Sequence, residues 1–336
     1  MNRLAVVVLN WNDIADTQEC LASLWKQTEK NFDIILVDNG SIEEDTGEFL
    51  ADAEATDRIT VLRNDINKGF AGGVNTGIRH AVANDYSHVA LFNNDAVADK
   101  DWLHELVTAA TEQNSGITTG LLLHRDGTTI DSTGDYCSNW GLPFPRSRGQ
   151  LADTAPESGE VFSGSGGASL YNIEMLHKIG LFDETFFAYY EDTDISFRAQ
   201  LYGYKVYYTN KAIAYHKQGA TSSKLPGFTV KQTFKNLPLF LTKNIPTGLL
   251  LSVGSRFWLA YYLMLANAIK KGNGAAALKG YAQSIYHFWT SALPARFKIQ
   301  RERTATTAEV KNMLWPDLPP DQTGLRKFRK IFTGKN

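Results

Sequence analysis

Cysteine is nearly absent from this chain. Its 336 residues include only two, Cys20 and Cys137. Two cysteines provide neither a framework of disulfide bridges nor the repeated spacing of a cysteine-ligated metal site, so a reducing, cytoplasmic setting is expected. No signal peptide is expected at the start of the sequence, because the apolar run at residues 4–9 is too short for the core of one. We interpret that run as a first buried strand.

Acidic residues are scarce in the C-terminal part of the chain. Residues 1–204 contain 13 Lys and Arg and 32 Asp and Glu, whereas residues 205–336 contain 21 and 4. The basic part is also rich in aromatic and aliphatic side chains, a composition typical of segments that bind an anionic membrane surface or nucleic acid. A simpler alternative is that the basic part packs against the acidic part. The composition favours the membrane, and no nucleic-acid partner is expected.

The change in character near residue 225 predicts two domains, 1–225 and 226–336, of which the second is helical and basic. Residues 244–269 carry a single charge, Arg256, and are long enough to span a bilayer. Pro246 and the near-central arginine disfavour a simple span. We therefore expect helices that pack within the domain or lie in the plane of the membrane surface. The same helices offer a contact for a homodimer.

Short apolar strands alternate with amphipathic helices over residues 1–125. Strands are predicted at 4–9, 33–38, 59–62, 88–92 and 117–123, and helices at about 14–27, 43–53, 70–83 and 99–113. This alternation is typical of an α/β fold in which helices cover both faces of a mostly parallel, Rossmann-like sheet. In such a sheet, ligands bind beyond the carboxyl ends of the strands.

Polar residues follow directly after the first two strands. Asn10 and Asn12 come after the first strand, and Asp38 and Ser41 after the second. A carboxylate in this place can accept a hydrogen bond from a nucleotide base or a ribose hydroxyl. It can equally form an Asx-turn or cap the following helix, and both interpretations stay open from these residues alone.

A Gly-rich stretch opens the helix expected at 70–83. It begins with Asn67, Lys68 and Gly69, and Asn75 lies further on. Small residues let a ligand approach the backbone, and a helix N-terminus favours an anion. The spacing matches neither the Walker motif nor the GxGxxG dinucleotide motif. Close packing of the helix start on a neighbouring strand is the alternative.

Asn93, Asn94 and Asp95 end the strand at 88–92. An acidic turn at the end of a strand can hold a divalent ion that bridges phosphate oxygens, and oxygen ligands favour Mg²⁺ or Mn²⁺. With a single carboxylate, such an ion would depend on a diphosphate for its other ligands; the alternative for Asp95 is a helix cap. His216, which ends a later strand, is either a further ligand or a structural residue.

Three carboxylates stand at the start of a later helix. Glu191, Asp192 and Asp194 follow the aromatic run at 186–190. Capping and the helix dipole explain the acids in part. The aromatic neighbours, however, fit a platform for a sugar ring, and the helix start helps to keep a general base ionised. Arg198 can pair with Asp194 at the i,i+4 spacing.

Taken in order, these motifs closely resemble glycosyltransferase family 2, with the GT-A fold, over roughly residues 1–220. The branch most similar contains rhamnosyltransferases and galactofuranosyltransferases of bacterial surface polysaccharides. The motifs that carry the resemblance are Val8 to Asn12, Val37 to Ser41, Asn67 to Gly73 with Asn75, Asn93 to Ala96, Gly180 to Glu184, Glu191 to Asp194 with Arg198, and His216.

The resemblance implies a role for each motif. Asp38 would bind the base or ribose, and the other donor contacts would be Asn10, Asn12, Ser41, Asn67, Lys68, Gly69, Asn75 and Asn94. Asp95 would bind the metal and His216 would complete the metal or diphosphate site. Asn93 stands where the family's Asp-x-Asp motif has its first acid, which leaves the coordination open. Asp192 would deprotonate the acceptor hydroxyl, with Glu191 or Arg198 holding it.

The implied activity is that of an inverting, metal-dependent hexosyltransferase. The favoured donor is dTDP-L-rhamnose, ahead of UDP-linked sugars, and the acceptor is a hydroxyl of a cell-surface polysaccharide or a lipid-linked glycan. The enzyme would lie on the inner face of the cell membrane. A sugar-phosphate nucleotidyltransferase would need a Gly-rich, basic turn after the first strand, which the sequence lacks. A non-catalytic carbohydrate- or nucleotide-binding protein would leave Asp38, Asp95 and Asp192 unexplained.

Overall fold

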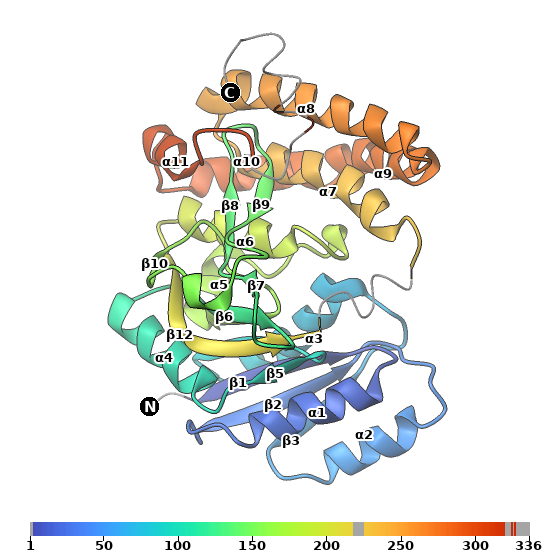
Figure 1. The fold of residues 1–336 in the computed structure, drawn as a ribbon, viewed down its shortest axis with the longest axis vertical. Coiled ribbons are helices and arrows are strands. Elements are labelled where there is room, and N and C mark those ends of the chain that lie inside the picture. The colour runs from blue at the N-terminus through green and yellow to red at the C-terminus, as the bar shows by residue number, and fades with distance from the viewer. Residues whose placement is uncertain (1–2, 218–224, 320–323, 325, 327–336) are drawn as a thin grey trace. The chain divides into compact units, whose positions relative to one another are not determined.

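The computed structural model describes residues 3–217, 225–319, 324 and 326 (Figure 1). These residues pack as two compact units. Unit 1 is formed by residues within 1–134, 145–200 and 204–220, and unit 2 by residues within 135–144, 201–203 and 221–336. The predicted domain boundary between residues 225 and 226 stays a prediction. It did not include the two short segments, 135–144 and 201–203, that pack with unit 2.

A parallel half-sheet forms the first part of unit 1. Strands β3, β2, β1 and β4 lie side by side in that order, and each pair is parallel. Their bounds are β1 Leu4–Asn10, β2 Phe32–Asp38, β3 Ile59–Arg63 and β4 His88–Asn93. Strands β1 and β2 are nearly continuous runs of buried apolar residues, because helices cover both of their faces. The predicted α/β arrangement is confirmed.

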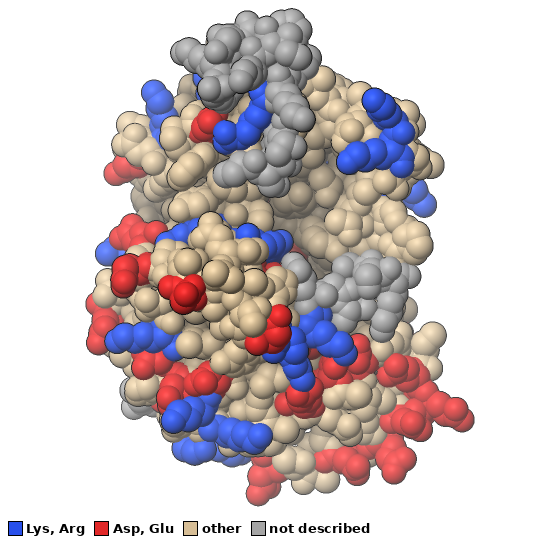
Figure 2. All heavy atoms as spheres, in the orientation of Figure 1, with Lys and Arg blue, Asp and Glu red and all other residues tan. Residues whose placement is uncertain are grey.

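Helices cover both faces of the sheet. Helices α1 (Ile14–Leu24), α2 (Thr46–Glu54) and α4 (Trp102–Gln113) share a core with one face of the sheet. Helix α3 (Gly69–Ala83) packs on the other face. Its Gly77 is needed there, since a Cβ atom would lie 2.7 Å from the Val7 side chain. Acidic side chains gather over α2 on the face drawn in Figure 2.

The remaining strands make the sheet mixed. Strand β11 (Ala168–Asn172) lies between β4 and β6 (Ile117–His124) and is antiparallel to both, whereas β12 (Val206–His216) is parallel to β6. Three short strands are added antiparallel: β5 (Ala96–Ala98) and β10 (Gly159–Glu160) pair with β12, and β7 (Ile130–Ser132) pairs with β6. Strand β12 has an irregularity between Tyr208 and Ile213, where its register with β6 shifts.

Unit 2 is helical, as predicted. Its helices are α7 Phe228–Asn244, α8 Leu250–Lys270, α9 Gly274–His287, α10 Leu293–Glu302 and α11 Thr307–Met313, and a π-helical turn at Phe288–Ala292 links α9 to α10. The unit also contains strand β8 (Asp135–Cys137), which pairs with β9 (Pro143–Pro145). That pair lies within residues 126–160, which are rich in Gly, Pro, Ser and Arg and show no strand pattern in the sequence.

The helix expected over 244–269 begins later than predicted. Helix α7 ends at Asn244 and a 3-10 turn covers Thr247–Leu249 before α8 starts, because Pro246 has no N–H to continue a helix. Helix α8 packs on α7, where the Tyr261 hydroxyl donates a hydrogen bond of 2.7 Å to the Phe234 carbonyl. By length and composition, the segment Thr247–Lys270 is the one helix in the described part of the chain that could cross a membrane.

Candidate active site

The carboxyl ends of β1, β2 and β4 meet at one edge of the sheet. The parallel register pairs Asn10 with Asp38, and it pairs Leu9 with Asn93. Residues that directly follow these strands are therefore neighbours in space, although up to some eighty residues separate them in the sequence. This edge brings together most of the polar residues that the sequence singles out.

Asp38 anchors the first polar group at this edge. Its Oδ1 accepts hydrogen bonds from the Asn10 amide at 2.9 Å and from the Ser41 hydroxyl at 2.6 Å. The backbone N–H of Asn12 donates to the Ser41 Oγ at 2.9 Å. Asp38 is buried, so its carboxylate is held rigidly. The structure thus unites Asn10, Asn12, Asp38 and Ser41.

Thr17 extends this group toward the end of β4. Its hydroxyl donates to the Asn10 Oδ1 at 2.9 Å and accepts from the Asn94 amide at 3.0 Å. Thr17 is fully buried on α1. Sequence reasoning missed Thr17, because a buried threonine in a helix has no signal that separates it from a core residue.

Asn39 organises the Gly-rich start of α3. Its amide donates to the Asn67 Oδ1 and to the Gly69 carbonyl, both at 3.1 Å. Lys68 reaches back to Asn64, with its Nζ 2.8 Å from the amide oxygen. The predicted donor residues Asn67, Lys68 and Gly69 are therefore fixed at the same edge as Asp38.

Asn75 is held differently from the other predicted donor contacts. Its amide donates to the Phe182 carbonyl at 2.8 Å and its Oδ1 accepts from the Phe182 N–H at 3.1 Å. It also donates to the Glu184 carboxylate at 3.0 Å. Asn75 is 1% exposed, so these contacts tie α3 to the loop at 182–184. Its predicted contact with a donor stays a prediction.

Asp95 and His216 meet through strand pairing. Strand β12 pairs with β5 so that His216 lies opposite Ala96, next to Asp95. The His216 Nε2 is 2.9 Å from the Asp95 Oδ1 and 3.3 Å from the Asn93 amide nitrogen. The predicted metal residues therefore come together. Within the described residues, no group of three or more His, Cys, Asp or Glu side chains could hold a metal ion.

Asp131 binds the other side of the His216 ring. Its Oδ2 lies 2.8 Å from the His216 Nδ1, and the Asp131 side chain is almost fully buried on β7. Burial alone would lower the pKa of His216, but the hydrogen bonds to Asp131 and Asp95 outweigh it and raise this pKa to about 9. Sequence reasoning missed Asp131, because β7 has only three residues, too few to show a strand pattern.

Asp192 lies at the start of α6 (Glu191–Leu201). Its Oδ2 accepts from the Gly166 N–H at 3.1 Å and its Oδ1 from the Thr193 N–H at 2.7 Å. Burial raises the pKa of Asp192, although these hydrogen bonds to the carboxylate oppose the shift. A carboxylate that binds protons more strongly than usual is better suited to act as a general base near neutral pH.

A Ser/Gly loop joins Asp192 to the end of β4. The Gly167 carbonyl accepts from the Asn93 N–H at 2.8 Å, while the adjacent Gly166 N–H binds Asp192. A Cβ atom at Gly167 would lie 2.9 Å from the Asn93 amide. The loop at 163–167 therefore sets the spacing between the strand end that precedes Asp95 and the carboxylate of Asp192.

The aromatic segment before α6 has unusual backbone geometry. Phe187, Tyr189 and Tyr190 all have positive φ angles, of 64°, 70° and 71°. Such angles are uncommon for bulky residues, and this strain is kept only where surrounding contacts impose it, often at functional sites. One such contact is the hydrogen bond of 3.1 Å from the Ala71 N–H to the Phe187 carbonyl, which ties the segment to α3.

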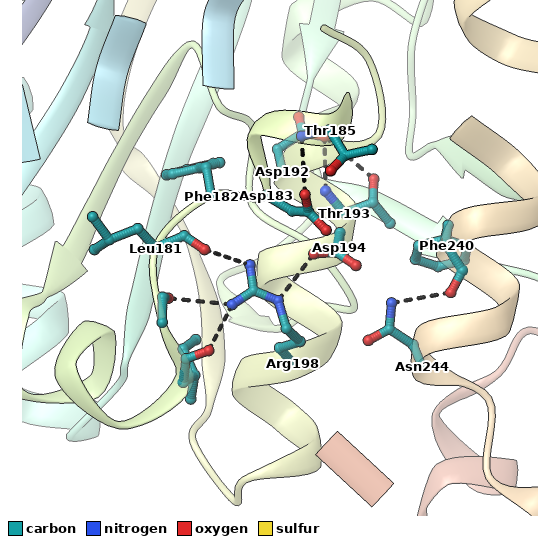
Figure 3. Close-up of polar contacts among 12 residues, drawn as sticks. Leu181, Phe182, Asp183, Thr185, Asp192, Thr193, Asp194, Arg198, Phe240 and Asn244 are labelled. Atoms are coloured by element: carbon teal, nitrogen blue, oxygen red, sulfur yellow. Dashed lines mark hydrogen bonds and ion pairs between the residues drawn. The ribbon is translucent and has the colours of Figure 1, made fainter. Parts of the chain in front are cut away.

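The family resemblance implied that either Glu191 or Arg198 holds Asp192. Arg198 does not bind Asp192 but binds Asp194 instead. Its Nε donates to the Asp194 Oδ2 at 2.9 Å, the ion pair at i,i+4 (Figure 3). Its two Nη atoms donate to the carbonyls of Ile179 and Leu181, both at 2.8 Å. The guanidinium is turned toward the loop that follows α5 (Ile173–Ile179), so its contacts are structural.

Comparisons with known proteins agree with this geometry. The model of the family described as glycosyl transferase family 2 matches residues 5–180, a little over half of the chain. The low-salt glycan biosynthesis hexosyltransferase Agl10 of Haloferax volcanii is 24% identical over 250 residues, which are 73% of this chain and 76% of that protein. An uncharacterized glycosyltransferase of Rickettsia conorii, RC0461, is 28% identical over 134 residues, 40% of this chain and 20% of that protein.

Two solved structures share the fold. GalNAc-T7, determined with UDP, GalNAc and Mn²⁺, has a TM-score of 0.62 and 16% identity, over 87% of this chain and 58% of that chain. The mannosyltransferase PcManGT of Pyrobaculum calidifontis, determined with GDP-Man and Mn²⁺, has a TM-score of 0.55 and 17% identity, over 100% and 88%. This likeness shows the GT-A fold. The family match, over more than half of the chain, means that the chain belongs to glycosyl transferase family 2 and is a glycosyltransferase.

Proposed function

We propose that this enzyme transfers a hexose with inversion to a hydroxyl of a cell-surface polysaccharide or lipid-linked glycan. The favoured donor is dTDP-L-rhamnose, and a UDP-sugar is the alternative. The observation that carries the proposal is the position of Asp192. Its carboxylate accepts a hydrogen bond from the Gly166 N–H. The neighbouring Gly167 binds Asn93, at the end of the strand that leads to Asp95. A base and a diphosphate site are thereby linked by one short loop.

The chemistry follows from this arrangement. Asp192 accepts the proton of the acceptor hydroxyl while the acceptor oxygen attacks the anomeric carbon. The bond from that carbon to the diphosphate oxygen breaks, and the nucleoside diphosphate leaves with the electron pair. A single displacement of this kind inverts the anomeric centre. Asp38 and its partners Asn10 and Ser41 hold the nucleoside end of the donor.

The donor set at Asp95 fits a divalent ion. The Asp95 Oδ1 and the His216 Nε2 are 2.9 Å apart and share a hydrogen bond in this structure. An ion held by both would take the place of the proton between them, because a ligand imidazole must be neutral. Two protein ligands suit an ion that takes its other ligands from a diphosphate and water. When bound, such an ion would offset the negative charge that develops on the leaving group. GalNAc-T7 and PcManGT, which share the fold, were both determined with Mn²⁺.

Replacing Asp95 by Asn should weaken Mn²⁺ binding about 100-fold or more, because it removes the one carboxylate among the ligands. The loss should be at least this large, since removing even a residue that only hydrogen-bonds to a metal ligand lowers metal affinity by about 10–100-fold. Calorimetric titration with Mn²⁺ in the presence of a nucleoside diphosphate measures the change. Glu112→Gln, which removes an exposed carboxylate of α4, is the control. Unchanged Mn²⁺ affinity in Asp95→Asn would rule out the proposed metal site.

Replacing Asp131 by Asn should weaken Mn²⁺ binding by about 10–100-fold, because a carboxylate that accepts from Nδ1 orients the ring of a ligand histidine and increases its basicity. Electron paramagnetic resonance of free Mn²⁺ measures the affinity directly. The exposed Asp126, in the turn between β6 and β7, provides the control Asp126→Asn. If wild type binds Mn²⁺ and Asp131→Asn binds it equally well, Asp131 has no part in the site.

The nucleotide can be identified by thermal stability. A ligand present at 100 times its Kd stabilises the folded state by about 2.7 kcal/mol. Melting the protein with dTDP, UDP and GDP, each with Mn²⁺, should show the largest shift with dTDP. A larger shift with UDP would replace the favoured donor by its alternative. No shift with any nucleotide, together with no release of nucleoside diphosphate from any donor, would favour a non-catalytic binder.

A further inference from the structure

Helices α7, α8 and α9 of unit 2 carry no acidic residue. No Asp or Glu occurs in the sequence between Asp194 and Glu302. The exposed charges of α8, α9 and the turn between them are all positive: Arg256, Lys270, Lys271 and Lys279. Basic side chains and uncharged surface fill this part of the view in Figure 2. Any partner of these helices is thus selected for negative charge.

Helix α8 has one buried face and one exposed apolar face. The buried face includes Phe257 and Tyr261, which are fully buried in unit 2. The exposed apolar side chains recur at helical spacing on the other side: Leu251 is 86% exposed, Leu259 46%, Tyr262 50% and Ile269 51%. A helix with this division is amphipathic, and neighbouring exposed apolar side chains of this kind mark an interaction surface.

Helix α9 and the π-helical turn after it repeat the pattern. Ile285 is 49% exposed, Tyr286 64% and Trp289 66%. The hydroxyls of Tyr262 on α8 and Tyr281 on α9 are 3.4 Å apart, so the two helices adjoin along this side. Exposed Trp and Tyr beside Leu and Ile, with lysines around them, match the chemistry of the boundary between lipid head groups and acyl chains.

We propose that the exposed faces of α8 and α9 bind the surface of an anionic lipid bilayer, with both helices lying in its plane. The positive charges fit anionic head groups, and the apolar residues fit the acyl boundary. Helix α8 does not span the bilayer, because Phe257 and Tyr261 are already packed inside unit 2 and Arg256 is exposed about a third of the way along it. Nucleic acid would match the lysines but would leave Leu251, Ile269 and Ile285 without a partner. The inference is independent of the transferase activity proposed above.

Flotation of the full-length protein with vesicles tests the surface. Wild type should bind vesicles that contain phosphatidylglycerol and should not bind vesicles of phosphatidylcholine alone. The triple variant Leu251→Ser, Tyr286→Ser, Trp289→Ser should bind at least tenfold more weakly, since all three side chains are mostly exposed and their loss spares the core. Each basic residue near an anionic surface contributes about fivefold, so Lys270→Gln, Lys271→Gln, Lys279→Gln together should weaken binding by about 100-fold.

Matched controls come from unit 1. Leu151→Ser removes an apolar side chain that is 58% exposed, and Lys26→Gln and Lys30→Gln remove exposed lysines; neither change should alter vesicle binding. The proposal is overturned if wild type ignores phosphatidylglycerol vesicles, or if the apolar triple variant binds them as wild type does. It is also overturned if that variant instead dissociates a homodimer, or if the protein resists extraction from membranes by alkaline carbonate, which indicates a spanning helix.

Discussion

Asp192→Asn should lower turnover by about 10²–10⁴-fold, the usual contribution of a general base. The amide keeps the shape of the side chain, and its oxygen can still accept from the Gly166 or Thr193 N–H, but it cannot take the acceptor proton. Donor binding should be unchanged, because Asp192 contacts neither Asp38 nor Asp95 in the hydrogen bonds of the site. Turnover is measured as release of nucleoside diphosphate from the donor that the melting experiments select, and donor binding by calorimetry.

The pH dependence gives a second test of the same role. A base works only when deprotonated, so kcat/KM should fall as the pH drops through the pKa of Asp192. Because burial raises this pKa, the fall should occur above the ordinary range of an aspartate, and Asp192→Asn should abolish it. Glu174→Gln, which removes an exposed carboxylate of α5, is the control. Full activity in Asp192→Asn would disprove the mechanism.

Arg198→Met should lower the free energy of unfolding by about 3–5 kcal/mol, the usual effect of removing one partner of a buried ion pair. The side chains of Arg198 and Asp194 are 5% and 0% exposed, so Asp194 would lose its cation in a place that water does not reach. The carbonyls of Ile179 and Leu181 would lose their donors as well. Urea unfolding followed by circular dichroism measures the change.

Arg198→Lys separates charge from geometry in this cluster. Lysine restores a positive charge but cannot reach Asp194 and the loop carbonyls together, because it has one nitrogen where arginine has three. Its stability should therefore lie between those of wild type and Arg198→Met. A catalytic Arg198 would predict the opposite pattern, with unchanged stability and a loss of turnover in both variants.

Local patterns were sufficient to predict the strands and helices of the parallel half-sheet. Strands β1, β2 and β4 are apolar runs bounded by polar residues, and α3 has a Gly-rich start. Each of these signals lies within a few residues of its own element, so it can be interpreted without knowledge of distant contacts. The placement of Asp38 and Asn94 at one edge also followed, because parallel strands joined by helices must bring their carboxyl ends together. The start of α8 was predicted too early, because the apolar pattern continues through Pro246 although the helix does not.

The sequence by itself determined which residues are chemically capable of the reaction: Asp38, Asp95, Asp192 and His216 were all singled out by residue type and by position after a strand or before a helix. Only the tertiary structure decided the partners. Asp131 binds His216 because β6 pairs with both β7 and β12, and Gly166 binds Asp192 because the 163–167 loop runs from the sheet to α6. Arg198 pairs with Asp194 at the i,i+4 spacing that the sequence shows, but its hydrogen bonds to the carbonyls of Ile179 and Leu181 depend on the packing of the loop after α5. Such choices depend on contacts between segments distant in the chain, which no local pattern encodes.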